Sequence, residues 1–242
     1  MAQTAIQLYS LRNVDRPFTE LLEEVADAGF DGVEFAYRVT DEDPNEVVAT
    51  LEDTGLSVAG AHVGIDGLEA EFEDTIEFYE TLGCEEIVIP ALSEESFASR
   101  EAVGEAIARL EAVEEDVNAR GHTLHYHNHH FEYTSLNGRT GYDVLVDESS
   151  INLQIDVGLA LMGGDDPVER IRSVGDRCRL LHLKDVDLEA GESVPLGDGD
   201  VDIDGCGEAF RSVGGEWLIY EFEGENPIAS LQPAADRMST LT

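Results

Sequence analysis

Residues 96–128 read SFASREAVGEAIARLEAVEEDVNARGHTLHYHN, and this stretch contains the unit from which the fold is predicted. Apolar residues recur in its first part at a spacing of three or four: Val103, Ile107, Leu110, Val113 and Val117. This spacing predicts an amphipathic helix over 96–120, which ends where Gly121 offers a left-handed cap. The residues that follow, 123–128, form a short run of strand length. A helix followed by a strand is the repeating unit of a parallel sheet.

The same unit recurs along the chain. Short apolar runs alternate with segments of helical period, and we expect eight strands, at 5–9, 32–35, 57–63, 86–90, 123–128, 152–157, 179–184 and 217–222. Eight strands that alternate with helices favour a (β/α)8 TIM barrel, an α/β fold, over a doubly wound sheet, which usually has fewer strands. The chain of 242 residues is close to the roughly 250 residues of such a barrel. We therefore expect a single domain over 1–242.

The charge balance of the chain is strongly acidic. It carries 14 Lys and Arg residues against 53 Asp and Glu residues, which gives a formal net charge of −39. Such a surface repels nucleic-acid phosphate and anionic lipid, so we expect neither nucleic acid nor a membrane as a partner. The acids are spread along the whole chain rather than gathered in a tail. This spread favours adaptation to high intracellular salt, as in a halophile, because salt screens the repulsion among carboxylates.

The cysteines and the first residues indicate the compartment. Cys84, Cys178 and Cys206 are few, odd in number and far apart, as expected of free thiols in a reducing cytosol. The first residues lack a basic segment followed by an apolar one, and no window approaches about 18 uncharged apolar residues. We therefore expect a soluble cytoplasmic protein, either a monomer or a homodimer.

Polar residues end most of the predicted strands. A TIM barrel places its active site at the C-terminal ends of its strands, so these residues are the candidates for chemistry. They are Gln7, Glu34, His62, His125, His127, His129, Asp156, His182, Lys184 and Glu221. Alternate residues of a strand face the same side, so His125, His127 and His129 would line the interior together. Acids and imidazoles delivered by several strands indicate a metal site.

The types of these residues restrict the metal. One Asp, one His and two Glu would form an oxygen-rich site with a single nitrogen. This set suits Mn²⁺, Mg²⁺, Co²⁺ or Fe²⁺ better than it suits the zinc of a thiolate site, although Zn²⁺ also binds such ligands. We expect one divalent metal, with Mn²⁺ as the first choice.

Six segments resemble the sugar phosphate isomerase/epimerase family: AIQLYSLR at 5–12, GVEF at 32–35, HNHHFE at 127–132, DVG at 156–158, HLKD at 182–185 and VPLGDGDVD at 194–202. This family belongs to the xylose isomerase-like TIM barrels, which have the AP-endonuclease-type fold. The resemblance covers nearly the whole chain. The HLKD segment and the Gly-Asp-Gly segment are its most specific parts.

The resemblance implies a divalent metal held by Glu, Asp, His and Glu from strands five to eight. On this chain those positions are Glu132, Asp156, His182 and Glu221. His127 and His129 compete with Glu132 for the fifth-strand position, because this part of the chain is rich in histidine. The resemblance also implies that Glu132 and Glu221 act from opposite sides as base and acid.

The sequence therefore predicts a metal-dependent isomerase or epimerase that acts on a small sugar, keto sugar or polyol through an enediolate intermediate. The substrate-binding residues would be Glu34, His62, His127, His129 and Lys184. The first alternative is a metal-dependent lyase, a dehydratase or hydratase of the inosose, dehydroshikimate or 3-keto-glycoside type, in which an imidazole or Lys184 is the acid. The second alternative is a non-catalytic sugar-binding barrel. A DNA-repair nuclease is disfavoured by the net charge of −39.

The acidity predicts a dependence of stability on salt. Lowering the salt lengthens the Debye distance from about 3 Å at 1 M to about 10 Å at 0.1 M, so repulsion among carboxylates reaches further. We expect cooperative folding and activity in roughly 2 M KCl and unfolding or inactivation after dialysis to low salt. Mild acid should rescue the fold in part, because protonation removes the same repulsion. Circular-dichroism melts at both salt concentrations test this, and an unchanged melting temperature would contradict it.

Overall fold

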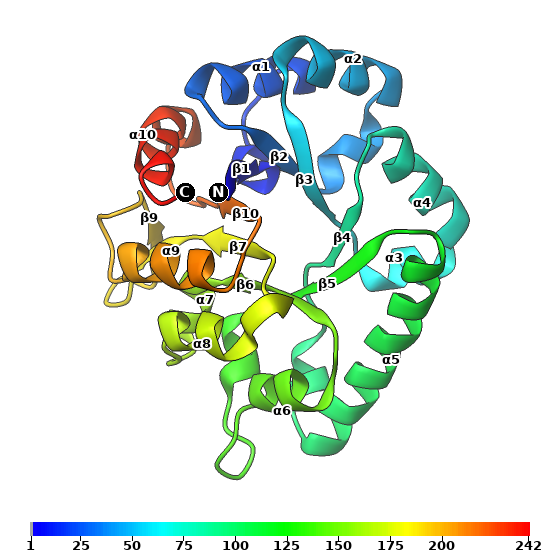
Figure 1. The fold of residues 1–242 in the computed structure, drawn as a ribbon, viewed down its shortest axis with the longest axis vertical. Coiled ribbons are helices and arrows are strands. Elements are labelled where there is room, and N and C mark those ends of the chain that lie inside the picture. The colour runs from blue at the N-terminus through cyan, green and yellow to red at the C-terminus, as the bar shows by residue number, and fades with distance from the viewer. Residues whose placement is uncertain (1) are drawn as a thin grey trace.

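The computed structural model of the chain describes residues 2–242 and confirms the predicted barrel. Within these residues, eight parallel strands form a closed ring: β1 Gln3–Gln7, β2 Gly32–Phe35, β3 Ser57–His62, β4 Glu86–Ile89, β5 Thr123–His127, β6 Asn152–Asp156, β7 Leu180–Leu183 and β10 Trp217–Tyr220. Successive strands of the ring are neighbours, and β10 closes it against β1. Figure 1 shows the helices arranged around the outside of this ring.

The helices connect the strands and pack their apolar faces against the barrel. The longer ones are α1 Phe18–Ala28, α2 Pro44–Thr54, α4 Phe72–Thr81, α5 Arg100–Ala119, α6 Gly141–Glu148, α8 Pro167–Val174, α9 Ile203–Ser212 and α10 Pro227–Ser239. Two shorter helices, α3 Ile65–Ala70 and α7 Val157–Met162, follow the C-terminal ends of β3 and β6. The short helix α7 therefore begins directly beside the end of the barrel where the predicted site lies.

Most predicted boundaries are correct to within two residues, and local hydrogen bonds explain where they differ. The strand predicted at 5–9 ends at Gln7, because the Gln7 side chain accepts a hydrogen bond from the N–H of Tyr9 and a 3-10 turn, Leu8–Leu11, begins there. The helix predicted from residue 96 instead begins at Arg100. The Ser99 hydroxyl caps it by accepting a hydrogen bond from the N–H of Ala102.

The interior of the barrel is filled in layers. Small and aliphatic side chains form the middle layer: Ala5, Ala59, Val88, Leu180 and Ile219. Nearer the N-terminal ends of the strands, His125 Nε2 lies 2.6 Å from Glu86 Oε2, and Arg179 Nη2 lies 3.2 Å from Glu86 Oε1. His125 therefore lines the barrel interior, but it lies deeper than the strand end at which His127 and His129 are found. Two residues along a strand displace a side chain by about 7 Å, so His125 belongs to the floor of the barrel.

A short antiparallel hairpin follows β7, in which β8 Asp185–Asp187 pairs with β9 Glu192–Val194. The buried Asp185 carboxylate holds the loop beyond it by accepting hydrogen bonds from the N–H groups of Gly197, Gly199 and Val201 at 2.8, 3.0 and 3.2 Å. A side chain at position 199 would not fit, because its Cβ would lie 2.3 Å from Asp185 Oδ1. The hairpin and its loop are thus anchored to the end of β7.

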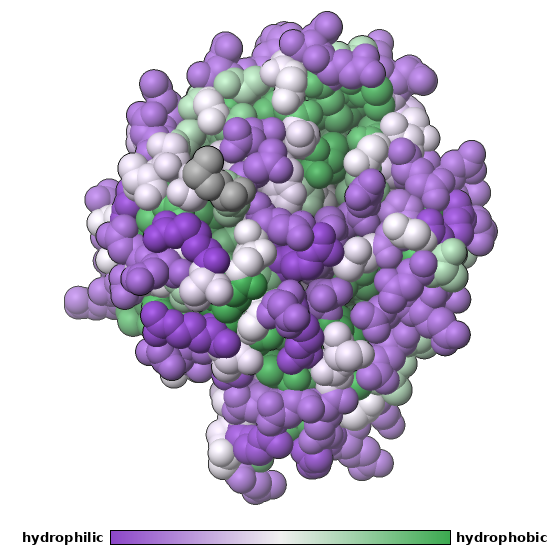
Figure 2. Space-filling view, viewed as in Figure 1, coloured by the Kyte–Doolittle hydropathy of each residue, from purple (hydrophilic) through white to green (hydrophobic). Residues whose placement is uncertain are grey.

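The outer surface is largely hydrophilic. Hydrophilic residues cover most of the face drawn in Figure 2. Among the described residues, no helix has both the length and the apolar character that a membrane crossing requires. The thiols of Cys84, Cys178 and Cys206 are free and buried, so none of them belongs to this surface.

The contacts of Glu86 at the barrel floor predict an acid-sensitive contribution to stability. Burial opposes ionisation of Glu86, but the hydrogen bond to His125 and the charges of His125 and Arg179 outweigh it and lower the pKa of the carboxyl. A carboxyl with a lowered pKa stabilises the fold at neutral pH and loses this effect as the pH falls through its folded-state value. We expect Glu86→Gln to lower the free energy of unfolding by about 1.5–3 kcal/mol at neutral pH. The difference in free energy of unfolding between the two proteins should shrink as the pH falls below 4.5, the ordinary pKa of this carboxyl.

Urea unfolding followed by circular dichroism, at neutral and acidic pH in molar KCl, measures this difference. Glu85→Gln is the matched control, because the neighbouring Glu85 is exposed. An equal loss of stability in both variants would show that the buried contacts contribute nothing specific. A difference that stays constant with pH would contradict the role of the Glu86 charge.

Candidate functional site

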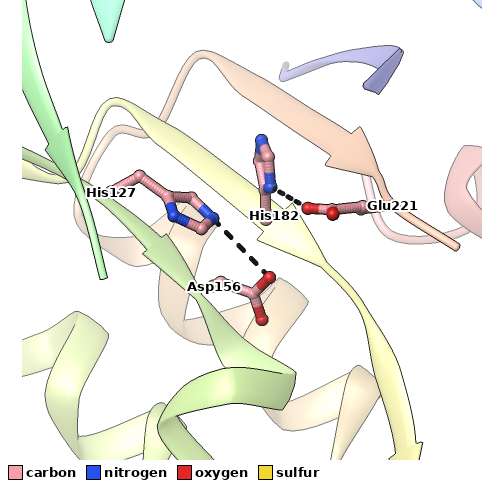
Figure 3. Close-up of side chains that lie close together, drawn as sticks. All are labelled: His127, Asp156, His182 and Glu221. Atoms are coloured by element: carbon pink, nitrogen blue, oxygen red, sulfur yellow. Dashed lines mark hydrogen bonds and ion pairs between the residues drawn. The ribbon is translucent and has the colours of Figure 1, made fainter. Parts of the chain in front are cut away.

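Four side chains converge at the C-terminal ends of four neighbouring strands (Figure 3). His127 ends β5, Asp156 ends β6, His182 lies in β7 and Glu221 directly follows β10. One nitrogen or oxygen atom of each lies within 4.8 Å of the others, and all four side chains are buried. Strand register explains part of this arrangement, since Asp156 pairs with His182 across β6 and β7. We call these residues the four-residue group.

Two buried atoms of this group have no hydrogen-bond partner. His127 Nδ1 lies 3.1 Å from the carbonyl oxygen of Pro90, which can only accept, so Nδ1 carries the proton and Nε2 presents a lone pair. Asp156 Oδ1 accepts a hydrogen bond from the N–H of Leu159, while Oδ2 is unpaired. His127 Nε2 and Asp156 Oδ2 face each other at 3.7 Å. Two buried acceptors that face each other are costly unless a cation lies between them, so the pair fits a metal ion.

The charge states of these two residues agree with that fit. Burial, with the nearby charges of His182 and His62, lowers the pKa of His127 well below its usual range and keeps the imidazole neutral, as a metal ligand must be. Burial also raises the pKa of the Asp156 carboxyl, although Lys184 opposes this effect. A bound cation would relieve the burial penalty of the Asp156 carboxylate.

His182 is held from both sides by carboxylates. Its Nδ1 lies 2.8 Å from Glu221 Oε2, and its Nε2 lies 2.6 Å from Glu34 Oε2. Burial alone would lower the pKa of this imidazole, but the charge of Glu34 and hydrogen bonds to both carboxylates raise it to about 10. A cation bound beside Glu221 would replace the proton on Nδ1, which leaves Nε2–H to donate to Glu34 and a neutral imidazole that directs Nδ1 at the rest of the group. A ligating histidine oriented by a carboxylate behind it is a common arrangement in metal sites.

Glu34, predicted to bind substrate, lies instead beneath the group at the centre of a buried network. The side-chain amides of Gln7 and Gln154 donate to its carboxylate. Burial opposes its ionisation, but the charges of His62 and His182 and its hydrogen bonds outweigh this and lower its pKa to about 2. Glu34, His62 and His182 also form a second set of residues that could hold a cation. Gln154 was not predicted, although an amide two residues before Asp156 in an apolar strand shares its inward face.

A cavity of about 420 Å³, the site cavity, opens above these residues. The predicted substrate-binding residues His62, His127, His129 and Lys184 line it, together with Glu221. The imidazole rings are closely packed, with centroids 5.2 Å apart for His127 and His129 and 5.3 Å apart for His62 and His182. The structure therefore gathers four of the five predicted substrate-binding residues around one opening.

Glu132 is not brought together with the other predicted ligands. It lies in the 3-10 turn His130–Tyr133, is fully buried, and accepts a hydrogen bond from the Tyr126 hydroxyl at 2.6 Å. Tyr126 precedes His127 in β5, so the two side chains point to opposite faces of the strand. Glu132 thus lies behind the strand, and His127 occupies the fifth-strand place in the four-residue group. Burial raises the pKa of Glu132 well above its usual range.

A chain of charged side chains borders the site cavity. Lys184 Nζ lies 3.3 Å from Glu221 Oε1 and also contacts Glu223, which is bonded to Arg12 at 2.9 Å. Burial opposes the charge on Lys184, but Glu221, Asp156 and Glu223 outweigh it and raise its pKa, so the ammonium stays protonated. The roles of Glu223 and Arg12 were not predicted, because their contact joins residues more than two hundred positions apart.

Comparison with known proteins agrees with the barrel fold. The family model described as "Xylose isomerase-like TIM barrel" matches residues 22–241. The chain is 27% identical over 195 residues to an inosose dehydratase of Geobacillus kaustophilus (strain HTA426), a match that spans 69% of this chain and 61% of that protein. It is 24% identical over 254 residues to an inosose dehydratase of Geobacillus thermodenitrificans (strain NG80-2), covering 88% of this chain and 84% of that one. The chain thus spans less than two thirds of the length of the first of these relatives.

A solved structure is also similar. The fold matches a sugar phosphate isomerase/epimerase from Parabacteroides distasonis ATCC 8503 with a TM-score of 0.85 and 19% identity, covering 98% of each chain. At this identity the likeness shows the fold alone.

The four-residue group predicts which substitutions remove metal. We expect the purified protein to bind one divalent metal, and Asp156→Ala and His127→Ala each to weaken that binding by about tenfold or more, since an incomplete shell remains. Glu132→Gln should keep the metal, because it changes a group behind the strand. Metal analysis after dialysis against Mn²⁺ measures the stoichiometry of each variant.

Circular dichroism of each variant is the control for folding, and Glu132→Gln is a control of similar burial outside the group. Full metal content in Asp156→Ala would refute the assignment of this group. Loss of metal from folded Glu132→Gln, with metal retained in His127→Ala, would transfer the fifth-strand position to Glu132.

Proposed function

Because the chain belongs to the xylose isomerase-like TIM barrel family, we propose that it is a divalent-metal-dependent enzyme acting on a small polyhydroxylated ketone, such as a keto sugar or an inosose. One observation carries this proposal: the unpaired His127 Nε2 and Asp156 Oδ2 face each other within a buried group of four potential metal ligands at the base of a cavity. A non-catalytic sugar-binding barrel has no need for buried acceptors held in this way.

His127, Asp156, His182 and Glu221 would hold one metal ion. Two imidazoles and two carboxylates suit Mn²⁺, Fe²⁺, Co²⁺ and Zn²⁺, and Mn²⁺ is the first to test. A bound divalent cation would polarise the substrate carbonyl and stabilise the negative charge that develops when a neighbouring proton is removed. Glu34 would orient His182 from behind, rather than contact the substrate.

The residues on the wall of the site cavity would move the protons. The Glu221 carboxylate lines the cavity and would remove the proton next to the carbonyl. Lys184 lies 3.3 Å from it and carries the proton that a departing hydroxyl needs. In this step a C–H bond and the β C–O bond break, a C=C bond forms, and the hydroxyl leaves as water with the proton of Lys184. This is the reaction of a lyase.

Loss of water is favoured over isomerisation by the position of Glu132. The isomerase expected from the sequence uses Glu132 and Glu221 as an acid and base on opposite sides of the substrate. Glu132 points away from the cavity toward Tyr126, so that pair is not assembled. The two relatives found by sequence are both inosose dehydratases, which supports the same choice.

Isomerisation or epimerisation is the second candidate. The imidazoles of His62 and His129 line the cavity from β3 and from the segment after β5, and neither strand is a neighbour of β10, which Glu221 follows. A proton removed by Glu221 could therefore be returned from another side by an imidazole. This arrangement would perform the reaction without a second carboxylate.

A mass-resolved assay separates the two reactions. Keto sugars, inososes, dehydroshikimate and 3-keto-glycosides would be incubated with the protein and Mn²⁺ in molar KCl prepared in D₂O. We expect a product lighter by one water, and Lys184→Met should lower kcat by about 10²–10⁴-fold because it lacks the acid. Asp156→Ala is the metal-free control.

A product that keeps the elements of water and carries carbon-bound deuterium, which makes it heavier than the substrate by one mass unit for each deuterium, would establish the isomerase instead. Turnover that persists undiminished in Asp156→Ala would refute the metal-dependent mechanism. Absence of metal-dependent reaction with every ketone of the panel would reject the proposed function.

A further inference from the structure

A second, larger opening adjoins the site cavity. This outer groove has a volume of about 1150 Å³ and lies between the β8–β9 hairpin and the segment that follows β10. Four residues line both the groove and the site cavity: His130, Leu159, Lys184 and Glu223. The two spaces therefore adjoin each other, with the Lys184–Glu223 ion pair at their boundary.

The outer groove presents apolar surface beside hydrogen-bonding groups. Leu159 and Met162 reach it from α7, and Phe222 from the segment after β10. Met162 is 36% exposed, which makes it one of the few large apolar side chains of the described chain open to solvent. Ser193 and Asn226 also line the groove. An apolar wall with a few polar groups suits a sugar ring or an aromatic group, whose faces are apolar and whose edges form hydrogen bonds.

The charges around the opening disfavour an anionic ligand. Apart from histidines, Arg12 and Lys184 are the cationic residues that line the two spaces in the described chain, and both are paired with Glu223. Glu192 and Glu225 add further negative charge to the groove. A phosphate would have to displace Glu223 from both cations and lie close to the other two acids. An uncharged ligand meets no such repulsion.

We infer that the substrate is an uncharged molecule of two parts, a keto sugar ring in the site cavity joined to a second ring or an apolar group in the outer groove. The inference rests on the proposed function only in taking the site cavity as the place of the reacting ring. A site of about 420 Å³ is at the lower end of the range of ligand pockets, about 300–1,000 Å³, and it has room for one sugar ring. The adjoining groove is then available to bind the group that is attached to the ring.

Binding of unreactive glycosides tests the inference without any turnover. Phenyl glucoside, methyl glucoside and glucose 1-phosphate share one ring and differ in the group attached to it. Their affinities would be measured by calorimetry on the full chain with Mn²⁺ in molar KCl, using both anomers of the two glucosides. We expect phenyl glucoside to bind about tenfold more tightly than methyl glucoside, and glucose 1-phosphate to bind most weakly.

Truncation of the groove wall should reduce this preference. Met162→Ala removes apolar contact with the attached group, so the ratio of phenyl to methyl affinity should fall to about threefold. Leu188→Ala is the matched control, because Leu188 is a large apolar residue, 47% exposed, that lines neither space. It should leave the ratio unchanged.

Equal affinities of the two glucosides, a ratio unaffected by Met162→Ala, or tightest binding of glucose 1-phosphate would overturn the inference. These outcomes are distinct from failure of the proposed function, because none of the three probes carries a ketone. A phenyl preference that depends on Met162 would support the two-part substrate even if every ketone tested proved unreactive. Turnover of ketones without any phenyl preference would leave the proposed function standing and remove this inference alone.

Discussion

The site depends on one interaction, the buried imidazole of His182 held between the carboxylates of Glu34 and Glu221. Charged groups inside a barrel are stable only when each has a partner, since removal of one partner leaves another charge buried and unpaired. The network therefore extends from His182 through Glu34 to the side-chain amides of Gln7 and Gln154. It forms a polar layer above the aliphatic middle layer. The orientation of His182 follows from this layer, because its members leave each other few alternative geometries.

The fold could be predicted from the periodicity of the apolar residues, and much of the site could be predicted from the polar residues that end the strands. Eight short runs separated by amphipathic helices specify a parallel barrel, and a barrel gathers the residues that end its strands. Asp156, His182 and Glu221 could be identified in this way because each lies at or beside the end of a regular strand. His127 could be identified only as one of several competing residues, since alternation gives the face of a strand but not the depth of each side chain along it.

The direction of the Glu132 side chain could not be predicted from the sequence. It lies beyond β5 in a 3-10 turn, where neither strand alternation nor helical period predicts the direction of a side chain. Its partner, Tyr126, is an outward-facing residue of the same strand, so a single turn carries the carboxyl from the expected inner face to the outer one. The contacts of Gln154 with Glu34 and of Glu223 with Arg12 and Lys184 could not be predicted for another reason: they join strands and loops that are distant in the sequence.

The β8–β9 hairpin connects two motifs that are separate in the sequence, the HLKD segment and the Gly-Asp-Gly segment. The buried carboxylate of Asp185, the last residue of the HLKD segment, holds the backbone of the Gly-Asp-Gly segment, and position 199 accepts no side chain. Ser193 of the hairpin in turn accepts a hydrogen bond from the N–H of Glu223. The wall of the outer groove is thereby joined through main-chain contacts to the strand ends that deliver His182 and Glu221.

The facing lone pairs of His127 and Asp156 would link folding to the supply of the metal that we propose binds between them. An unfolded chain does not hold these two atoms together, so any cation that binds between them favours the folded state over the unfolded one. Each tenfold rise in free metal above the dissociation constant would then add about 1.4 kcal/mol to the free energy of unfolding. The lifetime of such a protein in a cell would follow the concentration of the metal as well as the temperature and the salt, and starvation for the metal would remove the protein itself as well as its activity.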